Sequence, residues 1–344
     1  MEQQDASAKK SSLFVGIDLG TSSSAIVDSN RKKHWVESYV GWPKDFIAAK
    51  VLRKPVLFGS EALKNRLSLD IFRPLEHGVL KEGSSKEGES VKELIHHLVS
   101  LVKPEKDVPI YAVVGVPAES FKVNKKAIIN AVSDYVSSVI VVSEPFAVAY
   151  AMDLLNNAMI IDIGAGTVDF CIMHGTLPTE EDQRTILTAG DYIDNQLYKL
   201  LSEKFPDSTF NLNMVRLFKE QNSFVGSVKG QVKVEIPVAG KLVEHDITDE
   251  IRRACESILP PMVETITEMI AKFDPEYQSL IRSNIVLAGG GSQIRGLGEA
   301  LKTVLKDFGP IQVKIVDDPM FAGAAGAMKL AQEMPKHYWE KLNA

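Results

Sequence analysis

The chain has 344 residues, of which 45% are hydrophobic and 24% are charged, enough apolar material for two lobes with separate cores. A net charge of −6 offers no basic footprint for nucleic acid, so we expect no nucleic-acid partner. No apolar run approaches the roughly 20 residues that span a bilayer, which argues against a membrane-spanning class.

The N-terminus and the cysteines bear on the compartment. Residues 1–11 are polar, are expected to be disordered and lack the apolar core of a signal peptide, so we expect a cytoplasmic protein. The only cysteines are Cys171, within a predicted strand, and Cys255, within a predicted helix. We expect buried thiols rather than a disulfide or a cysteine-based metal site.

The first informative element is the apolar segment 13–27, which is interrupted by an acid, a glycine and small hydroxyl residues. This pattern predicts a strand, a tight turn and a second strand. The interrupting residues are Asp18, Gly20, Thr21 and Ser22. A third strand is expected at 34–40, and the less regular residues 41–75 are interpreted as a small subdomain inserted at the lobe's edge.

A parallel βαβ unit follows a charged loop at 81–90 and a helix at 91–102. Its strands are expected at 109–117 and 139–142, with a helix at 118–137 between them. Glu144 comes directly after the second strand, at the edge where open α/β sheets place their ligands. A carboxylate that only caps the next helix is the alternative interpretation.

A second hairpin at 159–173 repeats the pattern of the first, with apolar runs on either side of an acidic, glycine-rich turn. Its turn contains Asp162, Gly164, Ala165, Gly166 and Thr167. Glycines free backbone N–H groups to face a phosphate, and an aspartate at a strand tip can hold a hydrated cation. Taken alone this is also compatible with an ordinary hairpin, but the repeat indicates two related halves with a cleft between them.

The second half continues with a polar loop at 175–185 and helices at 189–205 and 213–221. On the latter, Lys219 and Glu220 face either a ligand or solvent. An alternating strand at 230–237 and its partner at 241–247 form a hairpin. A helix from 248 towards 273 must break or kink at its two prolines, 260 and 261.

Three consecutive glycines mark the third informative element, residues 283–297. A strand opens into Gly289, Gly290 and Gly291, followed by Ser292 and a helix, so bare backbone and a helix N-terminus meet at one point. The spacing fits neither a P-loop nor a full dinucleotide-binding motif. A last strand at 312–316 leads to a helix of small residues at 323–328, which permits close packing.

In this order the two hairpins, the Glu144 helix, the glycine triplet and the small-residue helix resemble the actin, Hsp70 and sugar-kinase ATPase superfamily. Within it, segments 75–79 and 219–226 resemble the MamK-type bacterial actins of magnetosome filaments, with MreB-type proteins next. The resemblance implies an α/β, two-lobed actin-like (ribonuclease H-like) ATPase fold, with a mixed sheet flanked by helices in each lobe. Lobe I would be residues 1–150, with 322–344 packing back on it, and lobe II would be 151–321, with an insert at 190–250.

The resemblance also implies roles for the site residues, with ATP or ADP and Mg²⁺ bound between the lobes. Asp18 and Asp162 would hold the metal, largely through water, and Glu144, Thr167 and Asp162 would serve catalysis. The nucleotide contacts would come from Asp18, Gly20, Thr21, Ser22, His77, Gly164, Ala165, Gly166, Thr167, Lys219, Glu220, Gly289, Gly290, Gly291 and Ser292. One departure is Arg216, where related proteins often carry a glutamate.

A polymerising cytoskeletal ATPase is the implied function, with slow Mg²⁺-dependent hydrolysis that drives turnover of filaments positioning magnetosomes. The partners would be further copies of the chain and magnetosome-associated adaptors. The polar N-terminus lacks the apolar residues with which MreB-like proteins insert into membranes, so no direct membrane insertion is expected. The alternatives are a cell-shape or plasmid-segregation actin and, on the same fold, a small-molecule kinase.

Overall fold

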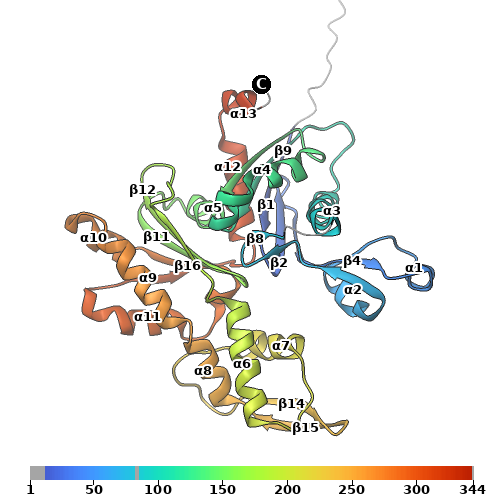
Figure 1. Cartoon of the computed structure of the whole chain (residues 1–344). Coiled ribbons are helices and arrows are strands. Elements are labelled where there is room, and N and C mark those ends of the chain that lie inside the picture. Colours follow the sequence, from blue (N-terminus) through green and yellow to red (C-terminus); the bar gives the residue numbers. More distant parts are fainter. Residues whose placement is uncertain (1–11, 82–84, 343–344) are drawn as a thin grey trace, which may run out of the picture.

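Two sheets with the same strand pattern organise the protein (Figure 1). The computed structural model describes residues 12–81 and 85–342. The first five-stranded sheet, in the order β10-β9-β1-β2-β3, contains β1 (Leu13–Leu19), β2 (Ser23–Asp28), β3 (Lys33–Glu37), β9 (Ile110–Val116) and β10 (Ser138–Ser143). The second, in the order β13-β12-β11-β16-β17, contains β11 (Asn156–Ile163), β12 (Val168–His174), β13 (Gln183–Ile186), β16 (Ile285–Ala288) and β17 (Val313–Ile315).

The two sheets share their connectivity as well as their order. In each, three consecutive strands form an antiparallel meander, and two later strands add in parallel beside its first strand. Asp18 and Asp162 are both the penultimate residue of that first strand. The predicted hairpins, the parallel βαβ unit and the α/β fold class are therefore confirmed.

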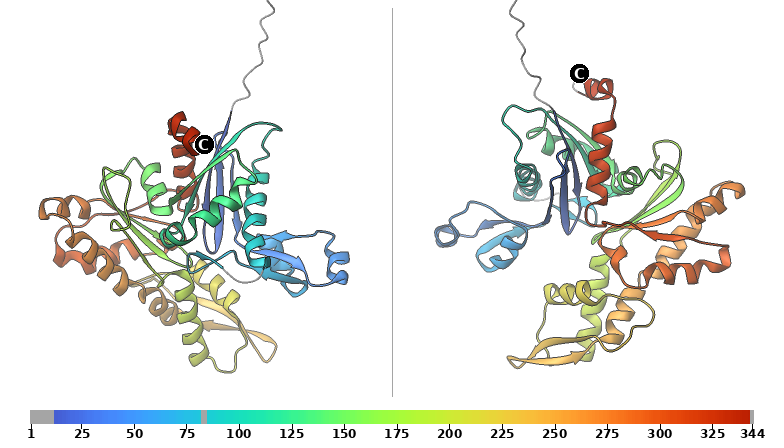
Figure 2. Two further views of the ribbon diagram at one scale, coloured as in Figure 1. Left: turned by 45° about the horizontal axis from the view of Figure 1, so that its top comes forward. Right: turned by 180° about the vertical axis from the view of Figure 1, so that it is seen from behind.

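Two helices join the sheets, α5 (Glu144–Ala151) and α12 (Ala322–Glu333). Phe146 of α5 packs in a cluster with side chains of the second sheet, whereas Ala147 packs against β9 of the first. The right view of Figure 2 shows α12 alongside β1. A Cβ on Gly326 would overlap the carbonyl of Ala147, so the small residues of α12 allow the close packing that the sequence predicts.

Two smaller units extend away from the sheets, one to the right and one to the bottom of the view in Figure 1. One is a three-stranded sheet with two short helices, made of β4 (Val40–Pro43), α1 (Phe46–Leu52), β5 (Leu57–Phe58), α2 (Gly59–Lys64), the 3-10 turn Arg66–Ser68 and β6 (Leu69–Phe72). The other comprises α6 (Gly190–Lys204), α7 (Leu212–Asn222), the hairpin of β14 (Lys233–Val238) and β15 (Lys241–Asp246), and α8 (Thr248–Glu256). The lobe boundaries given above stay a prediction.

The remaining elements cover the sheets or connect them. They are β7 (Leu75–Glu76), β8 (Val79–Leu80), α3 (Ser85–Leu101), α4 (Ala118–Ser133), α9 (Leu259–Ala271), α10 (Pro275–Arg282), α11 (Leu297–Leu305), α13 (Lys336–Leu342) and the 3-10 turns Gly290–Gln293 and Lys306–Phe308. No described helix has the length and apolarity that crossing a bilayer requires.

Several boundaries differ from the sequence prediction. Helix α3 already begins at Ser85, inside the predicted loop. The sequence prediction missed this start because the first two turns of the helix are charged and carry little apolar periodicity. The end of the loop predicted at 175–185 instead forms part of β13, which joins the second sheet through backbone pairing with β12. The predicted break at the two prolines lies just before them, since Pro260 and Pro261 occupy the first turn of α9. The expectation for residues 1–11 lies outside the described residues.

Candidate functional site

The two hairpin turns meet across a cleft of about 390 Å³. They are in contact, because a Cβ built on Gly166 would lie 2.6 Å from Oγ1 of Thr21. Most of the predicted site residues line this cleft: Asp18, Gly20, Thr21, Ser22, Glu144, Asp162, Gly164, Ala165, Gly166, Thr167, Lys219, Glu220, Gly289, Gly290 and Gly291. Residues far apart in the chain thus converge on one site.

Two predicted residues, His77 and Ser292, are not among the side chains that line the cleft. Ser292 is fully buried, and its hydroxyl donates to the carbonyl oxygen of Gly289 at 2.7 Å, which shapes the glycine turn from behind. His77 lies in a left-handed backbone conformation with φ 49°. Its neighbour Gly78 faces Thr167, since a Cβ there would lie 2.7 Å from the Thr167 methyl group.

The cleft also has lining residues that the sequence did not single out. They are Ser23, Trp35, Pro117, Ile163, Gly190, Ile193, Ser223, Gln293, Ile294, Pro319 and Met320. Pro117 directly follows β9, so its place at the carboxyl end of a parallel strand was a usable signal. No local pattern predicts that Trp35 on β3 lines the cleft, because the residues next to a strand side chain depend on the tertiary fold.

Three carboxyl groups define the acidic end of the cleft. Asp18 and Asp162 lie one residue before the ends of β1 and β11, and Glu144 begins α5 directly after β10. Burial raises the pKa of Asp18 to about 6, although a hydrogen bond with Glu144 opposes this shift. Burial, and then repulsion by neighbouring carboxylates, raises the pKa values of Glu144 and Asp162 well above their ordinary range.

A cation would relieve this crowding of buried acids, so the donor set fits Mg²⁺. Among the described residues no three His, Cys, Asp or Glu side chains form a group that could ligate one ion directly. The coordination largely through water stays a prediction, which rests on the reluctance of Mg²⁺ to give up its waters. Asp18 and Asp162 are the residues that would hold the ion.

The turns that line the cleft combine bare backbone with unused acceptors. Thr167 Oγ1 donates its proton to Asp169 at 2.7 Å, which leaves its lone pairs free to accept. Asp169 is fixed in turn by the backbone N–H of Ala118 at 3.0 Å and the hydroxyl of Thr185 at 2.6 Å. Within the described chain, Glu144 Oε1 and Thr21 Oγ1 are buried without a hydrogen-bond partner, which fits residues that serve a ligand.

The glycine triplet performs two separate tasks. A Cβ on Gly289 would overlap the Asp162 carboxylate, and one on Gly291 would overlap the side chain of Ile163, so both glycines let the turn pack on the end of β11. A Cβ on Gly290 would meet nothing within 4 Å, so this residue faces open space. The sequence predicted all three glycines against a ligand, whereas two of them also serve packing.

Lys219 and Glu220, on α7, also line the cleft. The Lys219 ammonium donates to the carbonyl oxygen of Gly190 at 2.9 Å and pairs with Asp194 at 2.8 Å. Burial raises the pKa of Glu220, against the attraction of Lys219. The sequence left open whether Lys219 and Glu220 face a ligand or solvent. Their place in the lining of the cleft favours a ligand.

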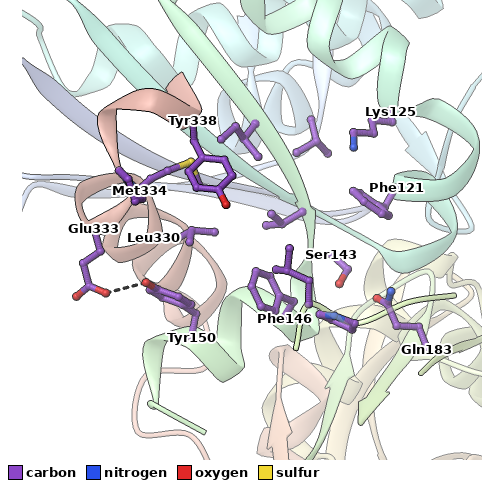
Figure 3. Close-up of a pocket in the computed structure, with 16 residues that line it drawn as sticks. Phe121, Lys125, Ser143, Phe146, Tyr150, Gln183, Leu330, Glu333, Met334 and Tyr338 are labelled. Atoms are coloured by element: carbon purple, nitrogen blue, oxygen red, sulfur yellow. Dashed lines mark hydrogen bonds between the residues drawn. The ribbon is translucent and has the colours of Figure 1, made fainter. Parts of the chain in front are cut away.

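A second cavity, of about 510 Å³, lies between α4, β10, α5 and the C-terminal helices (Figure 3). Its walls are mostly apolar, with Phe121, Phe146 and Leu330 among them. At its edge the Tyr150 hydroxyl donates to Glu333 at 2.7 Å, and burial raises the pKa of Tyr150 to about 12. None of the residues predicted for chemistry lines this cavity, so the smaller polar cleft is the candidate site.

A family model described as MreB/Mbl protein matches residues 12–338. The chain belongs to the MreB/Mbl family. Among curated relatives, the actin-like protein MamK of Paramagnetospirillum magneticum AMB-1 is 44% identical over 333 residues, covering 97% of this chain and 96% of the relative. Actin-like protein MamK of Magnetospirillum gryphiswaldense is also 44% identical, over 97% of this chain and 92% of its own.

Solved structures of MamK support the same placement in the MreB/Mbl family. A MamK double helical filament superposes with a TM-score of 0.92 at 43% identity, covering 94% of this chain and all of that one. A non-polymerising MamK mutant bound to AMPPNP gives a TM-score of 0.74 at the same identity and coverage. The actin-like fold and the resemblance to MamK-type bacterial actins are thereby confirmed.

Proposed function

We propose that this member of the MreB/Mbl family is a polymerising cytoskeletal ATPase that binds ATP in the cleft and assembles into actin-like filaments. One observation carries the proposal. Two glycine-containing turns, each preceded by an aspartate, line one cleft together with Glu144 and the glycine triplet. The similarity to MamK supports it, because that relative has been solved as a filament and, in a mutant, with AMPPNP.

In this proposal, different residues of the cleft contact different parts of the nucleotide. The turns at 20–22 and 164–167 clamp the phosphates from opposite sides, with backbone N–H groups and the hydroxyls of Thr21 and Ser22 as donors. Adenosine lies against the glycine triplet, and Lys219 and Glu220 contact the ribose or the base. Asp18 and Asp162 would hold Mg²⁺, largely through water, and the ion would neutralise negative charge on the phosphates.

Glu144 and Thr167 orient the attacking water in the proposed mechanism. Glu144 Oε1 and Thr167 Oγ1 are both free to accept, so the water donates its two hydrogens to them and turns a lone pair toward the γ-phosphate. Phosphoryl transfer passes through a loose transition state, so positioning and charge stabilisation suffice. Because the proposed chemistry relies on positioning alone, we expect turnover to be slow, which suits a timer for filament disassembly.

Assembly would be head to tail, since heterologous contacts that do not close repeat into a filament. The units at 41–75 and 190–250 are the proposed contact surfaces. By similarity to MamK, the filament would organise magnetosomes, together with adaptor proteins that bind it, and would form part of the cytoskeleton.

Sedimentation and electron microscopy of the purified protein test the proposal. With ATP and Mg²⁺ we expect filaments in the micrographs, a pelleted fraction that rises above a critical concentration, and slow phosphate release. Protein with ADP, and protein with ATP and a chelator, serve as controls. A chain that stays soluble and monomeric over all concentrations, salts and nucleotides would rule the function out.

A further inference from the structure

Arg73 connects the two turns of the cleft although it does not line the cleft itself. It follows directly on β6, and its Nε donates to the carbonyl oxygen of Thr21 in the first turn at 3.3 Å. Its Nη2 donates to Asp191 at 3.2 Å. Asp191 lies in the first turn of α6, and its backbone N–H donates to the carbonyl oxygen of Ala165 in the second turn at 2.7 Å.

A second arginine fixes the same aspartate from the other side. Arg216 Nη2 donates to Asp191 Oδ1 at 3.0 Å, and its Nη1 donates to the hydroxyl of Tyr39 at 2.7 Å. Its Nε also donates to Asp194 at 3.1 Å. The guanidinium of Arg73 lies 5.6 Å from the centre of the Tyr39 ring. Both oxygens of Asp191 are therefore bound by arginines, one from each half of the chain.

The local charges explain why position 216 is an arginine in this chain. A glutamate there would face Asp191 and Asp194, two carboxylates that Arg216 now pairs with. Like charges at that distance repel, and burial strengthens the repulsion. The Arg73, Asp191 and Arg216 side chains are only 18–23% exposed, so solvent screens their pairing less than it screens a surface pair.

We propose that Arg73 and Asp191 are positioning residues that hold the two phosphate-binding turns at a fixed separation. Glu144 comes from one half of the chain and Thr167 from the other. Both can therefore reach the same phosphate group only when the two turns keep a fixed position relative to each other. The planar guanidinium suits this role because it makes two bonds in fixed, different directions from a single rigid group. The inference rests on the proposed ATPase function and adds residues outside the cleft to it.

Steady-state hydrolysis measures the positioning effect. We expect Arg73→Ala to lower kcat at saturating ATP about three- to tenfold, with a smaller change in KM. Arg73→Lys should recover only part of the rate, because one ammonium cannot bond Thr21 and Asp191 in the same geometry. Arg73→Ala combined with Asp191→Asn should be no slower than the worse single variant. Arg66→Ala is the matched control, since Arg66 lies in the same small unit and its side chain donates to the local carbonyl oxygen of Leu63.

A distance measurement tests the connection without relying on activity. Spin labels at Val51→Cys and Leu242→Cys report the separation of the two small units, and both positions are exposed. The native Cys171 and Cys255 are buried, so the labels go to the introduced thiols. In dilute, nucleotide-free protein we expect one narrow distance in the parent and in Arg66→Ala, and a broader or longer distribution in Arg73→Ala.

Either of two results would overturn the proposal. An unchanged distance distribution in Arg73→Ala shows that Arg73 does not tie the turns together, and an unchanged kcat shows that the tie does not serve the reaction. If the parent protein neither binds nor hydrolyses ATP, the proposed function fails instead. The nucleotide-free distance measurement then still decides whether Arg73 fixes the two turns.

Discussion

The two turns of the cleft share a sequence pattern and a strand topology but differ in what holds them. The β1–β2 turn is held from outside: the Ser38 hydroxyl donates to the carbonyl oxygen of Gly20 at 2.8 Å, and Arg73 donates to that of Thr21. The β11–β12 turn is held by backbone groups: the Gly164 N–H donates to the carbonyl oxygen of Thr167 at 2.9 Å within the hairpin, and the Asp191 N–H of α6 donates to that of Ala165 at 2.7 Å.

This difference separates the roles of the two halves. The first turn is held by side chains that flank the three-stranded unit, so we expect a movement of that unit to reach the proposed phosphate site. The second turn is fixed by local backbone bonds and by α6, whose N-terminal Gly190 donates to the carbonyl oxygen of Gly164 at 3.1 Å. The two hairpins thus share a sequence pattern but differ in their supports, side chains for the first turn and backbone groups for the second, so we expect the first turn to respond more to movements of its neighbours.

The largest effect is expected at Glu144, which stands between the two turns. Glu144→Ala should keep ATP binding and assembly but slow phosphate release about 10²- to 10⁴-fold, because the attacking water loses its orienting carboxylate. Filaments of the variant should persist longer after ATP addition. The measurement is phosphate release alongside light scattering, with Glu333→Ala as control, since that carboxyl bonds Tyr150 beside the other cavity. Phosphate release at the parent rate would contradict the role.

The two aspartates provide a direct test of equivalence between the halves. Asp162→Ala and Asp18→Ala should each lower Mg²⁺-dependent hydrolysis about 100-fold and raise the Mg²⁺ concentration at half-maximal rate, because each removes one of two anchors for the ion. Similar losses of hydrolysis in the two variants would indicate that the two turns contribute equally to the metal site. A Mg²⁺ titration of phosphate release measures this, with Asp153→Ala as control, since Asp153 is an exposed carboxylate paired with Lys329. Parent-like hydrolysis in either variant would exclude that aspartate from the metal site.

Most of the fold and much of the cleft were predictable because their signals are local. Alternating and β-branched runs predict the strands, glycines predict the turns, and Glu144 follows a strand whose place in the sheet was clear. The supports were not predictable. Arg73, Asp191 and Arg216 lie in segments without a distinctive pattern, and they meet only after the halves fold together. Helix α10 and strand β13 were missed for a related reason, since their short segments are stabilised by packing and pairing.

The smallest effect is expected at the glycines that pack against the two aspartates, Gly289 against Asp162 and Gly323 against Asp18. Gly289→Ala should lower the free energy of unfolding by about 1–3 kcal/mol, because φ is +72° there and a Cβ would overlap the carboxylate of Asp162. Gly323→Ala should cost less, since its Cβ would lie 2.6 Å from the movable carboxylate of Asp18 and alanine favours helix α12. Thermal unfolding compares the two variants with Gly290→Ala, whose Cβ would meet nothing within 4 Å. Equal destabilisation by all three would mean that the glycines act through backbone freedom alone, and that the two aspartates are not supported in different ways.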